Sequence, residues 1–113
     1  MGSTDRELKR GTLEMILLRL LSQRPMYGYE IVTTLEKQGG SQFQLKEGTL
    51  YPVLYRLEDA GFIKARWETV ERGVPRKYYE LTETGTEQLQ LLVKEWHEFA
   101  AAVKSLLQME GIE

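Results

Sequence analysis

The chain has 113 residues, 42% of them hydrophobic and 28% charged, a balance typical of one small globular domain that excludes a disordered chain. The absence of cysteine excludes disulfide frameworks, cysteine-ligated zinc sites and thiol catalysis. The net charge of −2 excludes a nonspecific nucleic-acid coat. This total hides a gradient, because residues 62–81 carry five basic and three acidic side chains, whereas residues 82–113 carry two basic and six acidic ones.

Three helices are expected in the first half of the chain. The first begins at Thr4–Asp5, and its apolar residues up to Leu21 are too many for one stripe, which predicts a helix covered on more than one side. The second runs over residues 28–38, after the helix-stopping Pro25, and is followed by a loop. The third runs over residues 48–60, where apolar residues recur with the spacing of one helical face. Its expected buried residues are Leu50, Val53, Leu54 and Leu57.

The spacing of apolar residues then changes from that of a helix to that of a strand. Ile63, Ala65 and Trp67 alternate with charged residues, which predicts a half-buried strand. Residues 71–75 have turn chemistry, and residues 77–81 predict the return strand. Together they are expected to form a β-hairpin with a basic tip.

A last, long helix is expected from Thr82 or Thr84 to about residue 108, and Thr84 with Glu87 has the spacing of a capping box. Apolar residues recur in this helix at heptad a and d positions. This pattern predicts that the helix pairs with a second copy of the chain. The predicted dimer-interface residues are Leu89, Leu92, Trp96, Phe99, Val103 and Leu106.

This order of elements predicts a mainly α (α+β) fold, a winged helix-turn-helix with an appended C-terminal dimerisation helix. The expected division is residues 1–82 for the winged DNA-binding domain and residues 83–113 for the dimerisation helix. In such a module the third helix presents its polar face to the major groove, and the hairpin contacts the DNA backbone or minor groove. The predicted DNA-binding residues are Lys46, Thr49, Tyr51, Pro52, Tyr55, Arg72, Arg76 and Lys77. An alternative stays open, in which Thr49, Tyr51 and Tyr55 form only a solvated or locally packed face.

Three signatures in this order carry a family resemblance. Residues 47–58 (EGTLYPVLYRLE) resemble the recognition-helix signature of the PadR-like transcriptional regulators. The other matching residues are Gly28-Tyr29-Glu30 upstream and Arg76-Lys77-Tyr78-Tyr79, Leu81-Thr82 and Gly85 downstream. The resemblance covers about residues 11–96 and is closest to the short subfamily with a single C-terminal helix. It implies a homodimeric repressor that binds a pseudo-palindromic double-stranded DNA operator and is released by a small molecule or a stress signal.

The resemblance also bears on Trp96. In multidrug-responsive members of the family, a tryptophan at the matching place comes from both subunits, and the pair sandwiches flat aromatic ligands in a pore at the dimer interface. By this resemblance the ligand-binding residues are Met15, Val93, Trp96 and Ala100, with Glu14 as a further candidate. Ala100 departs from the drug-binding type because it offers no acidic partner to a cationic drug. In the alternative interpretation Trp96 only packs the interface.

An enzyme is not expected, and neither a cofactor nor a metal site is predicted. His97 is the only histidine, and no phosphate-binding loop or nucleophile motif is present in the sequence. The longest near-apolar run, residues 13–21, is too short to span a bilayer, and no secretory signal opens the chain, so we expect a cytoplasmic protein without membrane contact. Two other functions stay open: a winged helix used for protein–protein contact, and a drug-sequestering dimer without a regulatory DNA role.

Overall fold

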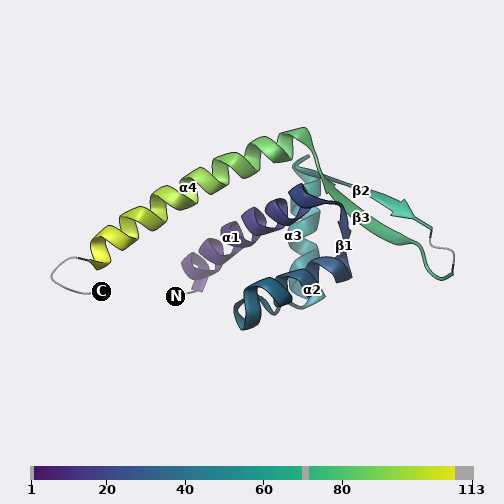
Figure 1. Cartoon of the computed structure of the whole chain (residues 1–113), viewed down its shortest axis with the longest axis horizontal. Coiled ribbons are helices and arrows are strands. Elements are labelled where there is room, and N and C mark those ends of the chain that lie inside the picture. Colours follow the sequence, from purple (N-terminus) through teal and green to yellow (C-terminus); the bar gives the residue numbers. More distant parts are fainter. Residues whose placement is uncertain (1, 70–71, 109–113) are drawn as a thin grey trace.

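Helices and one small antiparallel sheet build the chain, whose computed structural model describes residues 2–69 and 72–108 (Figure 1). The elements in chain order are α1 (Gly2–Gln23), β1 (Met26–Tyr27), α2 (Gly28–Gly39), the 3-10 helix η1 (Gly40–Phe43), α3 (Glu47–Asp59), β2 (Ile63–Glu68), β3 (Arg76–Leu81) and α4 (Glu83–Leu107). The hairpin of β2 and β3 projects from one side of the molecule, and the C-terminal half of α4 extends toward the other. This is a winged helix fold with a long C-terminal helix, as the sequence predicts.

One hydrophobic core joins the three N-terminal helices, the sheet and the beginning of α4. Helix α1 lies at its centre and contacts α3, β3 and α4, which confirms that its wide apolar surface is covered on several sides. Leu17 and Leu18 of α1 are fully buried, and full burial of a leucine contributes about 2 kcal/mol to folding. The predicted stripe of α3 is buried in the same core. The side chain of Tyr79 is also buried, and this burial raises the pKa of its hydroxyl to about 12.

The strands pair in the order β1-β3-β2, so β3 is central. Tyr79 on β3 lies opposite both Met26 of β1 and Ala65 of β2. Strand β1 was not predicted from the sequence, because two residues are too few to show an alternating pattern. The expected half-burial of Trp67 is wrong: its side chain is 68% exposed, because the outer part of β2 extends beyond the helices that cover Ile63.

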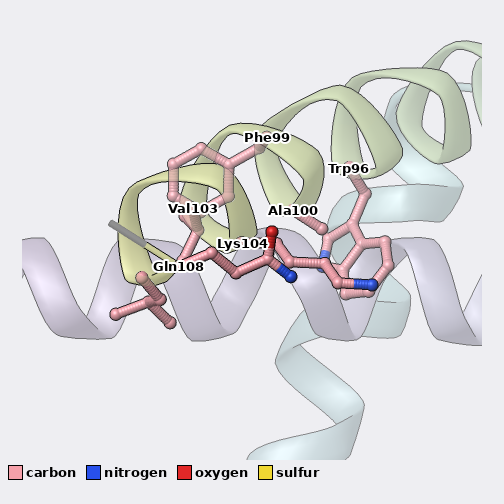
Figure 2. A pocket seen from close by; sticks show the side chains of 7 residues that line it. Trp96, Phe99, Ala100, Val103, Lys104 and Gln108 are labelled. Carbon is pink, nitrogen blue, oxygen red and sulfur yellow. The ribbon is translucent and has the colours of Figure 1, made fainter. Parts of the chain in front are cut away.

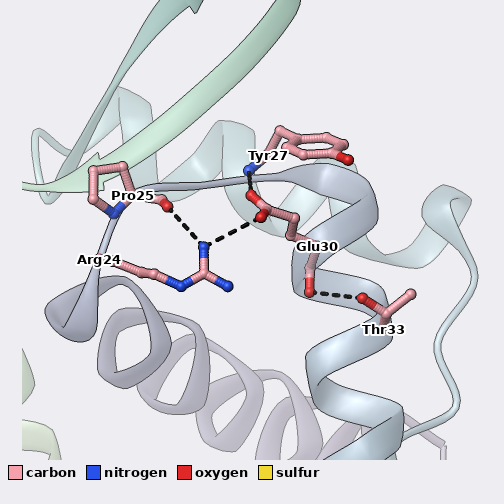
Figure 3. A network of polar contacts seen from close by, with 5 residues as sticks. All are labelled: Arg24, Pro25, Tyr27, Glu30 and Thr33. Atoms are coloured by element: carbon pink, nitrogen blue, oxygen red, sulfur yellow. Dashed lines mark hydrogen bonds and ion pairs between the residues drawn. The ribbon is translucent and has the colours of Figure 1, made fainter.

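The connection between α1 and α2 is held by the carboxylate of Glu30 (Figure 3). Glu30 Oε1 accepts a hydrogen bond from the backbone N–H of Tyr27 at 3.2 Å, and Glu30 Oε2 lies 3.2 Å from the guanidinium of Arg24. The same guanidinium donates to the carbonyl of Pro25 at 3.4 Å. These bonds fix β1 at the point where the chain enters the sheet, and with it the position of the Tyr27 ring.

Helix α4 begins at a tight junction with the sheet. The hydroxyl oxygen of Thr82 accepts the backbone N–H of Gly85 at 3.0 Å, and the hydroxyl donates to the carbonyl of Gly61 at 2.6 Å. Thr82 is therefore the N-cap, one of the two residues predicted for this position, and the capping box expected from Thr84 and Glu87 does not start the helix. Gly85 is required here because a Cβ atom at this position would lie 1.9 Å from the carbonyl oxygen of Phe62.

Two other boundaries differ from the sequence prediction. Helix α1 begins at Gly2 instead of Thr4, since a residue that favours a cap does not prevent the helix from continuing. The loop expected after α2 contains the short helix η1. Neither difference moves the exposed face of α3.

Candidate nucleic-acid interface

Helix α3 turns one face outward because the opposite face is packed on α1 and α2. The structure leaves four of the predicted DNA-binding residues exposed on or before this helix: Lys46, Thr49, Pro52 and Tyr55. No side chain caps the helix, and the carbonyl of Lys46 accepts the N–H groups of Thr49 and Leu50. The positive end of the helix dipole and the Lys46 ammonium thus lie together, an arrangement that favours an anion such as a phosphate.

Tyr51 does not stand free on the exposed face. It is half-buried, and its hydroxyl oxygen occupies the space where a side chain at position 28 would begin, 2.2 Å from an ideal Cβ on Gly28. Its ring stacks on Tyr55 with a centroid separation of 6.0 Å. Burial raises the pKa of the Tyr51 hydroxyl, and the nearby Glu47 raises it further. Tyr51 therefore joins α3 to the start of α2 and supports the exposed ring of Tyr55.

Lys77 points toward α3 and not outward from the hairpin. Its Nζ lies 3.7 Å from Glu58 Oε1, and it also lies over the rings of Tyr55 and Tyr79, at 5.6 and 5.3 Å from their centroids. The side chain is half-buried, and its charge faces a carboxylate of the same chain. This geometry suits a contact that fixes the hairpin against α3 better than a free contact to DNA.

The other cations of the hairpin differ in whether a carboxylate already faces them. Arg66 donates to Glu68 and lies 3.5 Å from Glu80, so it is neutralised within the hairpin. Arg72 and Arg76 are exposed and form no ion pair with any carboxylate of residues 11–69 and 72–108, whose side chains are described, although Glu68 lies opposite Arg76 in the strand register. Lys46 also has no ion-pair partner in this part of the chain. Among the predicted DNA-binding cations, those without an ion pair in this part of the chain therefore lie at the start of α3 and along the end of the hairpin.

An ion pair joins α1 to α3 behind this face. The guanidinium of Arg56 lies 3.4 Å from Glu14 Oε2. Glu14, which the sequence suggested as a partner for a cationic ligand, is thus engaged by Arg56. An exposed pair of this kind contributes about 0–1 kcal/mol, so its main effect is on the orientation of α3.

The C-terminal half of α4 carries exposed apolar side chains. Leu89 and Leu92, at the beginning of the predicted dimer row, pack against the core of the same chain. Farther along the helix, Trp96, Phe99 and Leu106 are 45%, 59% and 67% exposed. The predicted row therefore divides between the core of the chain and an outer surface.

A hollow of about 480 Å³ lies along this outer surface (Figure 2). Its described lining residues belong to α4 and its C-cap, and are Trp96, Phe99, Ala100, Val103, Lys104, Leu107 and Gln108. Two of the predicted ligand-binding residues, Trp96 and Ala100, are among them, whereas Met15 and Val93 pack against the core. Lys104 and Gln108 were not predicted, although they follow Ala100 at helical spacings of four and eight.

Comparison with known proteins decides the family. The model described as "Transcriptional regulator PadR-like family" matches residues 17–91, which include α2, α3 and the hairpin. The chain belongs to this family. Its members are transcriptional regulators and not enzymes.

Relatives of this PadR-like protein differ in length. Uncharacterized protein X of Lysinibacillus sphaericus is 42% identical over 109 residues, which cover 95% of this chain and 96% of that protein. The negative transcriptional regulator PadR of Bacillus subtilis is 31% identical over 68% of this chain, but the match covers only 42% of PadR. The crystal structure of a PadR family regulator from Eggerthella lenta is 36% identical, with a TM-score of 0.82 and coverage of 96% and 93% of the two chains. This chain thus spans less than half the length of PadR but nearly all of the other two.

Other kinds of site are not found in the described parts of the PadR-like chain. The described side chains, those of residues 11–69 and 72–108, include no group of three histidine, aspartate or glutamate residues that could hold a metal ion. His97 lies against the edge of Trp96, with the ring centroids 5.5 Å apart. No helix within these residues has the length and hydropathy needed to cross a membrane. In the described part of the chain, the exposed face of α3 with its cations and the hollow on α4 are the two candidate surfaces for binding.

Proposed function

We propose that the chain is a homodimeric DNA-binding repressor that binds a pseudo-palindromic operator in the cytoplasm. The observation that carries the proposal is the exposed face of α3, flanked by cations that form no ion pair with a described carboxylate, in a chain whose family consists of DNA-binding regulators. The name of the Bacillus subtilis relative, a negative regulator, supports repression. Thr49 and Tyr55 supply base contacts in the major groove, and Lys46, Arg72 and Arg76 supply phosphate contacts.

A second copy of the chain covers the C-terminal half of α4. Exposed Trp96, Phe99 and Leu106 form a continuous apolar row on one helix, which in water favours burial against another apolar surface. Pairing through this row places two α3 helices on one duplex. Their separation of about one DNA turn, roughly 34 Å, accounts for a two-fold symmetric operator.

The effector of this dimer is a planar aromatic molecule that enters the hollow beside Trp96. Among the described residues, the lining is apolar except for Lys104 and Gln108, and none of these residues carries a carboxylate. Neutral or anionic aromatics therefore fit it better than cations do. A ligand releases DNA only if it binds the free dimer more tightly than the operator-bound dimer, because equal affinity for both shifts nothing.

The experiment that tests DNA binding is a footprint on the region upstream of the protein's own gene at two salt concentrations. The measured affinity should fall steeply with salt. Lys46→Ala and Arg72→Ala should each weaken binding several-fold and reduce the slope of log affinity against log salt by about 0.9, the value for one phosphate contact. Lys94→Ala removes the same charge from α4, where Lys94 pairs with Glu98, and should change neither quantity.

Two results would contradict the proposal. Absence of a protected region at both salt concentrations would leave the winged helix as a protein-binding module. Equal effects of Lys46→Ala and Lys94→Ala would mean that only the overall charge is sensed and that the face of α3 has no special role.

A further inference from the structure

Two arginines on the outward face of the sheet lie over tyrosine rings, and only one of them forms an ion pair with a described carboxylate. The guanidinium of Arg76 lies 4.6 Å from the centroid of Tyr27, and that of Arg66 lies 5.5 Å from the centroid of Tyr78. Arg66 is neutralised by Glu68 and Glu80. Arg76 has no such partner among the described residues, so its charge stays available to an anion from outside.

Tyr27 is held more firmly than an exposed aromatic side chain usually is. Its backbone lies in β1, opposite Tyr78, and its N–H is bound by the carboxylate of Glu30. Its ring packs edge-on against Tyr78 with centroids 5.3 Å apart and is stacked beside Tyr29 at 6.4 Å. The ring thus forms a fixed support under the guanidinium of Arg76.

A guanidinium that lies over a ring keeps its in-plane N–H groups free to donate. The contact with the ring also restricts a long side chain that would otherwise lose conformational freedom on binding. We propose that Tyr27 positions Arg76 to bind a phosphate of the DNA backbone, so that the outward face of the sheet is part of the DNA-contacting surface. This inference rests on the proposed DNA-binding function and assigns to it a residue outside α3 and the hairpin.

The test is a thermodynamic cycle on the full-length protein with the operator duplex. Tyr27→Leu should weaken binding roughly 2- to 5-fold, the range of a partly exposed cation–π contact. Tyr27→Phe keeps the ring and should bind like the wild type. In an Arg76→Ala background Tyr27→Leu should have no further effect, because Tyr27 acts through the guanidinium. Lys94→Ala, which removes a charge from α4, is the matched control and should leave affinity and salt dependence unchanged.

Thermal unfolding of each variant separates this role from a purely structural one. If Tyr27→Leu weakens binding equally with and without Arg76, or if Tyr27→Phe binds as poorly as Tyr27→Leu, Tyr27 does not act by holding Arg76. If the wild type itself leaves no footprint, the proposed function fails and this inference fails with it. If the wild type binds the operator but the effects of Tyr27→Leu and Arg76→Ala simply add, the inference about Tyr27 is wrong while the proposed function stands.

Discussion

The two halves of α4 carry the same kind of apolar row but use it differently. In the first half Leu89 is only 9% exposed and packs with the core, against which α1 also packs. In the second half Trp96 is 45% exposed, Phe99 is 59% exposed and Leu106 is 67% exposed. One row of a single helix therefore belongs first to the chain's own core and then to an exposed surface.

The comparison shows why a heptad pattern does not by itself define an interface. The spacing of apolar residues fixes which side of the helix is buried, and it gives no information about which chain buries it. Here the position of α1 decides which part of the row is buried within the chain, because α1 contacts α4 beside the sheet. The interface that we propose consequently begins near Trp96 and not at Leu89.

The substitution expected to disrupt the first half of α4 most strongly is one that adds a side chain at Gly85. In Gly85→Ala the new Cβ would meet the backbone carbonyl oxygen of Phe62 at 1.9 Å, and backbone cannot rotate away as a side chain does. We expect a loss of at least about 3 kcal/mol in the free energy of unfolding, measured by urea denaturation. Gly11→Ala is the control, since nothing lies within 4 Å of its Cβ and alanine favours a helix by about 0.5–1 kcal/mol. Equal stability of the two variants would mean that α4 is not anchored at this junction.

Truncating one leucine in each half separates the two uses of the row. Leu89→Ala should lower the free energy of unfolding by about 2–3 kcal/mol at every protein concentration, because it leaves a cavity in the core. Leu106→Ala should cost less than about 0.5 kcal/mol in dilute protein and more in concentrated protein, where the dimer forms. Urea unfolding at two widely separated concentrations measures both effects. A loss for Leu106→Ala that is independent of concentration would show that the second half is not an interface between copies.

Much of the winged helix could be predicted from sequence because its signals are local. The stripe from Leu50 to Leu57 and the alternation that begins at Ile63 each mark one element and its buried face. The features that were not predicted depend on contacts between residues that are far apart in the sequence. Whether Trp67 is covered depends on how far the helices reach along β2. The sequence left open whether Thr82 or Thr84 caps α4, and the Thr82 cap is supported by Gly61, 21 residues earlier, whose carbonyl accepts the Thr82 hydroxyl.

The candidate site was predicted as a set of residue types, and its electrostatics were not. Sequence treats Arg66, Arg76 and Lys77 as equivalent cations of one hairpin. Their partners come from the pleat and from α3: side chains alternate between the two faces of β3, so Lys77 meets Glu58 while Arg76 meets Tyr27. Pairing of this kind decides which cations remain free to bind an anion, and the spacing of residues in the sequence does not predict it.

The smallest expected effect on stability, and the most informative on function, comes from Trp96. Because 45% of this side chain is exposed in the chain, Trp96→Ala should change the stability of dilute protein by less than about 0.5 kcal/mol. It should nevertheless abolish release of operator DNA by a planar aromatic anion such as naphthoate, since the ring forms one wall of the hollow.

In a Trp67→Phe background Trp96 is the only tryptophan, so quenching of its fluorescence by naphthoate measures binding directly. Leu91→Ala, on the same helix and 48% exposed but outside the hollow, should keep both responses. If naphthoate quenches Trp96 yet releases DNA equally well from the Trp96→Ala variant, binding at the hollow is not what weakens the operator complex, and the second half of α4 serves only to pair the two copies.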